Sequence, residues 1–339
     1  MIVELVSPAR RWAQAVAALP TTIPSSLAYF WSDRLHRRLQ EAAGRWRFDA
    51  VFVHCAFVAP YVDGIDTRYR FLDFVDMDSG KWAEYARHRA FPLSLGYGLE
   101  AAKLRAYERT AASKFHQCGV TTQGELETYQ TLGVSVPCAV LPNGVDTGYF
   151  TQRPQGPSGG AVIAFLGRMD YYPNVDGVLY FAREVFPLVR AQKPSAEFRI
   201  IGMNPTAEVR ALANVPGILV TGRVPDVRLY MQDATLTIAP LRIARGTQNK
   251  VLESMAMGIP VVATTPAARG VQAEAGKHLL VSDTPRGMAD HIVRLVEDVD
   301  LCRSLAAAAH EQVQRAHNWA STCGQLEKML SHAPIPIAA

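Results

Sequence analysis

Short runs of apolar residues alternate along the whole chain with segments in which apolar positions recur every three or four residues. Runs of about four to eight apolar residues have the length of buried strands, and the periodic segments have the spacing of helices with one buried face. In the first half the runs predict strands at 3–6, 49–54, 70–75, 117–121 and 139–142. In the second half they predict strands at 161–166, 197–201, 218–221, 235–239, 260–263 and 278–281. This alternation predicts an α/β fold in which helices wrap parallel sheets.

The clearest helical pattern lies at 175–192, where apolar residues fall on one stripe of the predicted helix. Further helices are predicted in the first half at 33–45 and 95–115, and in the second half at 206–213, 227–232, 247–257, 286–298 and 301–317. Most of these helices lie between two predicted strands, which is the arrangement that parallel strands need.

Residues 152–160 interrupt the alternation, because Gln-Arg-Pro-Gln-Gly-Pro-Ser-Gly-Gly favours neither a helix nor a central strand. We therefore predict a first domain over residues 1–150, a linker over 151–160, a second domain over 161–317, and a C-terminal helix and tail over 318–339. Two doubly wound domains joined by a linker leave a cleft at the carboxyl ends of their strands, where such folds bind ligands.

Composition excludes several classes of protein. The chain of 339 residues is long enough for two domains, and 49% hydrophobic with 19% charged residues is a globular balance. The longest apolar stretch, 51–62, is shorter than the ~20 residues that cross a bilayer. Five scattered cysteines without a C-x-x-C pair predict neither a disulfide framework nor a zinc site. With no signal peptide pattern at the amino end, these features predict a cytoplasmic protein.

The net charge of +4 is too small to indicate a nucleic acid partner, but it is unevenly distributed. Residues 1–47 contain seven arginines, three acidic residues and the aromatic residues Tyr29, Phe30, Trp31 and Trp46. Arginines beside aromatic rings favour peripheral contact with an anionic membrane. The alternative is a solvated helix face with the aromatic rings in the core.

Candidate chemistry concentrates after the strand at 235–239. A loop there contains Arg245 and Gly246, and the following helix opens near Thr247 and Gln248. The amides of a first helical turn, the positive end of the helix and a nearby arginine form a site that suits phosphate groups. A glycine at position 246 lets the backbone approach such a group closely.

Lys250 and Glu253 are three residues apart, so they share one face of that helix. The lysine can reach a diphosphate, and the carboxylate one turn deeper can accept hydrogen bonds from the hydroxyls of a sugar or ribose. The alternative is a surface ion pair of little energetic value.

These residues belong to a segment, Gly-Thr-Gln-Asn-Lys-Val-Leu-Glu-Ser-Met-Ala-Met-Gly-Ile-Pro-Val-Val-Ala at 246–263, that resembles the signature of nucleotide-sugar glycosyltransferases of GT-B architecture. Leu-Pro-Asn-Gly-Val-Asp at 141–146 is similar to the end of their first domain. Phe-Leu-Gly-Arg-Met-Asp-Tyr-Tyr-Pro-Asn at 165–174 resembles the glycine turn of their donor domain. Residues 200–203 and 220–226 are similar to the strand ends that hold the nucleotide base.

A closer similarity is to the bacterial sugar transferases associated with exopolysaccharide and exosortase (PEP-CTERM) gene clusters. It rests on Asp-Phe-Val-Asp-Met-Asp-Ser-Gly-Lys-Trp at 73–82, on Met-Asp-Tyr-Tyr-Pro-Asn at 169–174 and on the Arg-Gly-Thr-Gln-Asn-Lys helix start.

The resemblance implies two Rossmann-like domains, a nucleoside diphosphate sugar donor with uridine as its base, and a glycan or lipid-linked acceptor at the inner face of the cell membrane. It implies retention of anomeric configuration, with neither a metal nor another cofactor. Lys250 and Glu253 become the catalytic pair. Donor binding falls to Gly167, Arg168, Gly202, Arg223, Val224, Arg245, Gly246, Thr247 and Gln248.

The chain departs from the family pattern at three places. Arg245 stands where retaining relatives have a second glutamate, which makes an acidic donor sugar conceivable, and Pro173 stands where a lysine is frequent. We therefore expect Lys250, with Arg168 or Arg245, to replace the usual pair of cations. The strand, glycine turn and helix that relatives place before residues 3–6 are not found, so the resemblance predicts a first domain incomplete at its amino end.

Further candidates follow strands of the first half. His54 follows the strand at 49–53, where it could contact the donor sugar or the leaving group, or be structural. An acceptor sugar could be held by hydroxyl-binding groups and a stacking ring in the segment after residue 73. These acceptor-side candidates are Asp76, Asp78, Lys81 and Trp82.

The sequence thus predicts a glycosyltransferase acting in the synthesis of exopolysaccharide or another cell-envelope glycan. Two alternatives remain: a nucleotide-sugar epimerase of the same fold, and a catalytically inactive homologue that binds a sugar nucleotide. A nicotinamide dehydrogenase is disfavoured, because no G-x-G-x-x-G follows a predicted strand.

Overall fold

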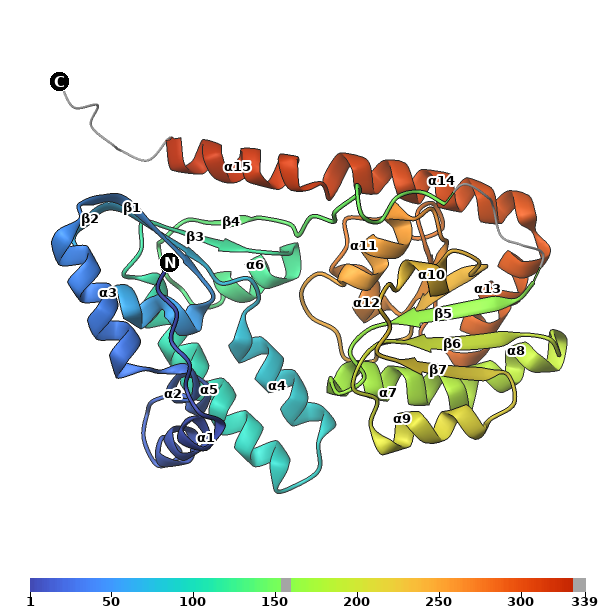
Figure 1. Ribbon diagram of the computed structural model, residues 1–339, viewed down its shortest axis with the longest axis horizontal. Coiled ribbons are helices and arrows are strands. Elements are labelled where there is room, and N and C mark those ends of the chain that lie inside the picture. The colour runs from blue at the N-terminus through green and yellow to red at the C-terminus, as the bar shows by residue number, and fades with distance from the viewer. Residues whose placement is uncertain (154–159, 332–339) are drawn as a thin grey trace. The chain divides into compact units, whose positions relative to one another are not determined.

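A computed structural model describes residues 1–153 and 160–331 (Figure 1). Most of the predicted linker, and the tail from 332 onward, lie outside these residues. The chain forms two compact units, one of Met1–Leu141 with the chain from Gly324 onward, the other of Pro142–Cys323. This division differs from the predicted ranges, because Val145 and Phe150 already pack into the core of the second unit. The chain returns to the first unit within its last helix, α15 (Trp319–Ser331).

The first unit is built on a parallel sheet whose strands follow one another in chain order: β1 (Phe48–His54), β2 (Thr67–Asp73), β3 (Gln117–Val120) and β4 (Cys138–Val140). Neighbouring residues of a strand point to opposite faces. Leu72 therefore packs with Ala112 and other residues of the connecting helices. On the other face Phe71 packs with Leu326 and Met329 of α15. Figure 1 shows α15 alongside this sheet. Both faces of the first sheet are thus covered by helices.

The remaining helices of the first unit connect or precede these strands. They are α1 (Pro8–Ala17), α2 (Ser25–Phe30), α3 (Asp33–Arg45), the 3₁₀ helix η1 (Ala56–Val62), α4 (Asp78–His88), α5 (Leu93–Ala112) and α6 (Gln123–Gln130). The predicted helices at 33–45 and 95–115 correspond to α3 and α5. The sequence analysis proposed no helix over the range of α1, α2 or α4.

The strand predicted at 3–6 is wrong. Residues 1–7 have no regular secondary structure, and the side chains of Val3 and Leu5 are 55% and 88% exposed. Arg38 donates a hydrogen bond to the carbonyl of Val3, and Glu4 lies within ion-pair distance of Arg34 and Arg38 of α3. The segment is therefore held against α3 by its polar groups. It pairs with no strand, although its apolar and polar residues alternate.

The second unit contains a parallel sheet in the order β10-β9-β8-β5-β6-β7, of which Figure 1 labels β5, β6 and β7. Its strands are β5 (Val162–Leu166), β6 (Glu197–Ile201), β7 (Ile218–Gly222), β8 (Leu236–Ala239), β9 (Val261–Ala263) and β10 (Leu280–Val281). From β5 the chain adds β6 and β7 on one side of the sheet, and it then adds β8, β9 and β10 on the other side. The sheet is therefore doubly wound, and its order reverses between β5 and β8, where such sheets have their ligand crevice.

The helices of the second unit agree with the sequence pattern, except that no helix is predicted over 265–269 and that the helix predicted at 175–192 is interrupted. They are α7 (Tyr172–Tyr180), the π-helical turn η2 (Phe181–Val185), α8 (Phe186–Gln192), α9 (Ala207–Ala211), η3 (Leu212–Asn214), α10 (Arg228–Met231), α11 (Asn249–Ala256), α12 (Thr265–Arg269), α13 (Pro285–Glu297) and α14 (Val299–Ala316). The helix predicted at 175–192 contains the wide turn η2, in which the N–H of Phe186 donates to the carbonyl of Phe181. Pro187 follows at once, and a wider turn accommodates a residue that has no N–H to donate.

Candidate active site

Two glycines bring the ends of β5 and β6 into contact at the crevice of the second sheet. The N–H of Gly167 donates to the carbonyl of Ile201 at 3.0 Å. Gly202 has a φ of 149°, and a Cβ there would lie 1.8 Å from the carbonyl oxygen of Gly167. Only glycine fits at position 202, so these two predicted donor-binding residues are neighbours in space.

Lys250 lies across the turn between β5 and α7. Its Nζ donates to Asn174 Oδ1 at 3.0 Å and to Gln248 Oε1 at 3.4 Å, and it sits 5.3 Å from the centre of the Phe165 ring. A Cβ on Gly167 would lie 3.4 Å from the lysine Cε. The ammonium is therefore held by neutral oxygens beside the glycine turn, at the point where the strand order reverses.

Asn174 is the residue that orients this lysine, and the sequence analysis assigned it no role. Its side chain is only 4% exposed. The amide nitrogen donates to the carbonyl of Arg168 at 2.9 Å, which leaves Oδ1 to face Lys250. The sequence does show a polar residue at position 174, near the start of a helix that follows a glycine turn. Its contact with Lys250 could not be predicted, because the two residues are far apart in the chain.

Burial governs the charges of the predicted catalytic pair. It lowers the pKa of Lys250 to about 8 and raises that of Glu253, while the attraction between the two groups opposes both shifts. No ion pair within 4 Å joins them, and the Glu253 carboxylate accepts no hydrogen bond from the residues the structure describes. The interpretation as an exposed surface ion pair is therefore wrong. The charge of Glu253, beyond ion-pair distance, thus offsets the burial of the Lys250 ammonium only in part.

The loop before α11 presents further groups to the same crevice. Gly246 has a φ of 63°, and its carbonyl oxygen lies 1.9 Å from where a Cβ of Gly270 would be. Within residues 1–153 and 160–331, the buried hydroxyl of Thr247 has no hydrogen-bond partner, and no side chain caps the first turn of α11. The helix opens at Asn249, two residues after the position expected for the phosphate site.

The arginines of the second unit differ in their partners. Arg168 forms a bidentate pair with Asp170 at 2.8 and 3.1 Å, and this pair, with a hydrogen bond from Asn204, lowers the pKa of the Asp170 carboxyl to about 2. Arg223 is exposed after β7. Arg245 is half-buried, and its carbonyl accepts a hydrogen bond from Gln248 at 3.1 Å. Nε and Nη2 of Arg168 face Asp170, so contact of this arginine with a donor would fall to Nη1.

Val224, predicted to face the nucleotide base, has a partly buried side chain. It packs against the core cluster that contains Ile201 and Met231. Its side chain therefore supports the loop after β7, and contact with a base would fall to the backbone of that loop.

In the first unit the structure pairs His54 with a residue of the neighbouring strand. His54 Nδ1 lies 2.9 Å from Asp73 Oδ2, and Asp73 Oδ1 accepts a hydrogen bond from the N–H of Val75 at 3.0 Å. Cys55 and Val75, which follow the two strands, have φ values of 78° and 67°. Such angles are strained for residues other than glycine, and strain of this kind gathers at functional sites. His54 keeps an exposed Nε2.

The acceptor-side candidates lie in the loop after β2 and in the first turns of α4. Asp78 and Lys81 form an ion pair, and Asp76 accepts a hydrogen bond from Thr121 at 2.9 Å. Burial, and next the charge of Glu125, raise the pKa of Asp76 to about 6. Trp82 is half-buried, 5.3 Å from the ring of Tyr97.

Two buried carboxylates hold the beginning of α4. Glu108 accepts hydrogen bonds from the N–H and the hydroxyl of Ser79, and Glu125 accepts one from the N–H of Met77 at 2.7 Å. Burial raises the pKa of Glu108 to about 7. The amides at this helix start are thus occupied by the protein itself.

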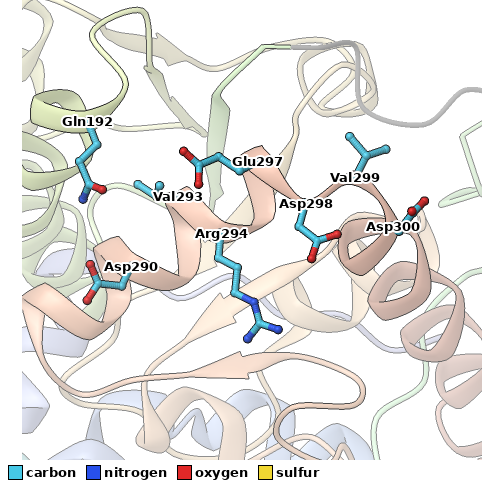
Figure 2. A pocket seen from close by; sticks show the side chains of 8 residues that line it. All are labelled: Gln192, Asp290, Val293, Arg294, Glu297, Asp298, Val299 and Asp300. Atoms are coloured by element: carbon cyan, nitrogen blue, oxygen red, sulfur yellow. The ribbon is translucent and has the colours of Figure 1, made fainter.

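A cavity of the second unit lies elsewhere. It has a volume of about 500 Å³ and is lined by Gln192, Asp290, Val293, Arg294, Glu297, Asp298, Val299 and Asp300 (Figure 2). These residues gather around the carboxyl ends of α8 and α13, and α8 leads directly into the start of β6. The cavity is therefore at the amino edge of the sheet, away from Lys250, and its size does not identify the active site.

Two further structural observations concern the described part of the chain. It contains no cluster of three or more His, Cys, Asp or Glu side chains arranged to hold a metal ion. None of its helices combines the length and the apolar character that crossing a bilayer requires.

Comparison with known families decides what the second unit is. Residues 160–298, which run from β5 to the end of α13, match the family described as Glycosyl transferases group 1. These residues form the domain of this chain that is similar to glycosyltransferases. Every donor-binding residue predicted from the sequence lies within this domain. Comparison with curated proteins gave no match.

Solved structures resemble the whole fold. TarM superposes with a TM-score of 0.67 at 16% identity over 90% of this chain and 57% of its own. Sucrose-phosphate synthase of Thermosynechococcus elongatus gives 0.67 at 14% identity, over 88% of this chain and 77% of its own. HepE of Anabaena in complex with UDP superposes with a TM-score of 0.69 at 15% identity, over 88% of this chain and 81% of its own. The fold is therefore GT-B, and the chain spans little more than half the length of TarM.

Proposed function

We propose that this protein transfers a glycosyl group from a nucleoside diphosphate sugar, with uridine as the base, to a hydroxyl of a glycan or lipid-linked acceptor. One observation supports this most strongly: the Lys250 ammonium is half-buried, bound by neutral oxygens and without an ion-pair partner among the described residues, at the strand reversal of a glycosyltransferase domain. A diphosphate supplies the missing negative charge. HepE, which shares the fold, is known in complex with UDP.

In the proposed reaction the bond between the anomeric carbon and the diphosphate oxygen breaks, and a bond to the acceptor oxygen forms with retention of configuration. The proton of the acceptor hydroxyl passes to the departing diphosphate. Negative charge develops on that diphosphate, so Lys250 and the uncapped amides of α11 stabilise the transition state. Glu253 accepts hydrogen bonds from donor hydroxyls. We assign the neutralising charge to these groups and to no bound metal.

His54 is the residue of the first unit that we assign to the donor sugar or the leaving group. Asp73 fixes its tautomer by accepting from Nδ1, which directs Nε2 outward. Asp76, Asp78, Lys81 and Trp82 are proposed to contact the acceptor. We place the reaction in exopolysaccharide or cell-envelope glycan synthesis at the inner face of the membrane, with residues 1–47 against anionic lipids.

The test is a thermal-shift series with UDP, GDP, ADP and CDP, followed by mass spectrometry of products from the matching sugar nucleotides with and without acceptor. We expect UDP to raise the melting temperature most and transfer to require the acceptor. Conversion of the donor sugar without an acceptor would identify an epimerase. Nucleotide binding without turnover would identify an inactive homologue, and no stabilisation by any nucleotide would contradict the proposal.

A further inference from the structure

A cavity of about 470 Å³ lies within the first unit between α1 and α2, which Figure 1 shows side by side. Its walls are mostly apolar: Ala17 and Ala18 come from α1 and the residue after it, and Leu27, Ala28 and Trp31 come from α2 and its end. This volume is that of a ligand pocket, which spans ~300–1,000 Å³. None of the donor or acceptor candidates lines it.

Large apolar side chains are exposed around this cavity. Trp12, Val16 and Leu19 are 63%, 60% and 53% exposed, and Ile23, which lines the cavity, is 50% exposed. Trp12 and Val16 are four residues apart and share one face of α1. Exposed apolar groups gathered on one short helix and its following turn indicate contact with another apolar surface.

The cavity has a polar group in its wall, and a cation lies one helical turn away from it. Gln14 lines it and donates from Nε2 to the carbonyl of Trp31 at 3.4 Å. Its buried Oε1 has no hydrogen-bond partner in the residues that the structure covers. Arg11, one turn earlier on the same face of α1, lies 5.8 Å from the centre of the Tyr29 ring and has no carboxylate within 4 Å in those residues. Arg10 differs, because it pairs with Asp33.

We propose that this cavity binds a hydrocarbon chain of an anionic membrane phospholipid, with the phosphate of the headgroup at Arg11. The apolar walls take up the chain, a headgroup hydroxyl donates to Gln14 Oε1, and the exposed residues of α1 enter the surrounding bilayer. The cation of Arg11, one turn before Gln14 on the same face of α1, favours an anionic lipid over a second protein surface. The inference deepens the proposed contact of residues 1–47 with lipids, but lipid binding can be measured without glycosyl transfer.

The test uses the full chain with vesicles of phosphatidylglycerol whose acyl chains carry bromine, which quenches tryptophan fluorescence on contact. We expect the quenched signal to fall in Trp31→Phe, because that ring lines the cavity, and to be kept in Trp319→Phe, because that ring belongs to the second unit. Ala17→Phe fills the cavity from an exposed position and should weaken vesicle binding at least tenfold. Ala13→Phe adds the same ring to an exposed site of α1 that does not line the cavity, and should bind as the wild type does.

The charge is tested by Arg11→Gln, which should bind phosphatidylglycerol no better than phosphatidylcholine vesicles. Wild-type binding and quenching in Ala17→Phe would overturn the proposal. So would quenching by free dibromostearate without vesicle binding, or a wild-type dimer that Ala17→Phe dissociates. All variants should keep their stabilisation by UDP, which depends on the second unit. Loss of lipid binding is thus distinguished from misfolding and from failure of the proposed transferase function.

Discussion

Replacing Lys250 with methionine removes the half-buried ammonium and keeps an unbranched apolar side chain that is one atom shorter. The pKa of this lysine is about 8 in the folded protein against 10.5 ordinarily. At ~1.36 kcal/mol for each pH unit, the charged form destabilises the fold by about 3 kcal/mol. Methionine relieves this cost at neutral pH but leaves the buried Asn174 Oδ1 without its donor, which costs about 1–3 kcal/mol.

The pH dependence separates these two effects. Between pH 8 and 10.5 the unfolded wild type binds a proton that the folded protein does not, so wild-type stability rises with pH across this window. The lost hydrogen bond does not depend on pH. The free energy of unfolding of the wild type, minus that of Lys250→Met, should therefore increase by about 2 kcal/mol between pH 7 and pH 10.

Urea denaturation followed by circular dichroism at pH 7, 8, 9 and 10 measures this difference. The matched control is Lys277→Met, because Lys277 is exposed and lies 3.9 Å from Glu274 in the same unit. The difference in free energy of unfolding between the wild type and Lys277→Met should change little between pH 7 and pH 10. If the difference in free energy of unfolding between the wild type and Lys250→Met also stays constant with pH, the claim that the ammonium is desolvated is refuted. The same variant should lose stabilisation by UDP, since the cation that faces the diphosphate is gone.

Three further predictions concern other parts of the molecule. Gly202→Ala places a Cβ against the carbonyl oxygen of Gly167, so thermal denaturation should show a lower melting temperature and calorimetry weaker UDP binding. Asp73→Asn removes the carboxylate from His54, and steady-state kinetics should show kcat lowered at least ~10-fold with the donor KM unchanged; an unchanged kcat would show a merely structural pair. Glu108 has a folded pKa of about 7 against 4.5 ordinarily, so wild-type stability should fall by about 3 kcal/mol as pH rises from 4.5 to 7. Urea titrations of Glu108→Gln should lack this fall, and an equal fall in both proteins would contradict the assignment.

Local patterns were enough to predict most strands and the helix that presents Lys250, because burial of one face fixes the period of apolar residues. They could not predict that Asn174 holds this lysine, since the contact depends on the order of strands in the sheet. The segment 3–6 has the period of a strand but lies against α3, because Glu4 finds arginines there. The sequence pattern likewise could not predict the partner of His54, since only the register of β1 with β2 brings His54 to Asp73.

The covering of the first sheet by α15 has a consequence for biosynthesis. Phe71 and Leu141 are synthesised before the second unit, whereas Leu326 and Met329, which cover them, are synthesised after it. At ~5–20 residues per second, this apolar face waits on the order of ten to forty seconds for its cover. The amino-terminal half therefore completes its folding only after the carboxyl-terminal domain has been translated, and chaperones have that interval in which to bind.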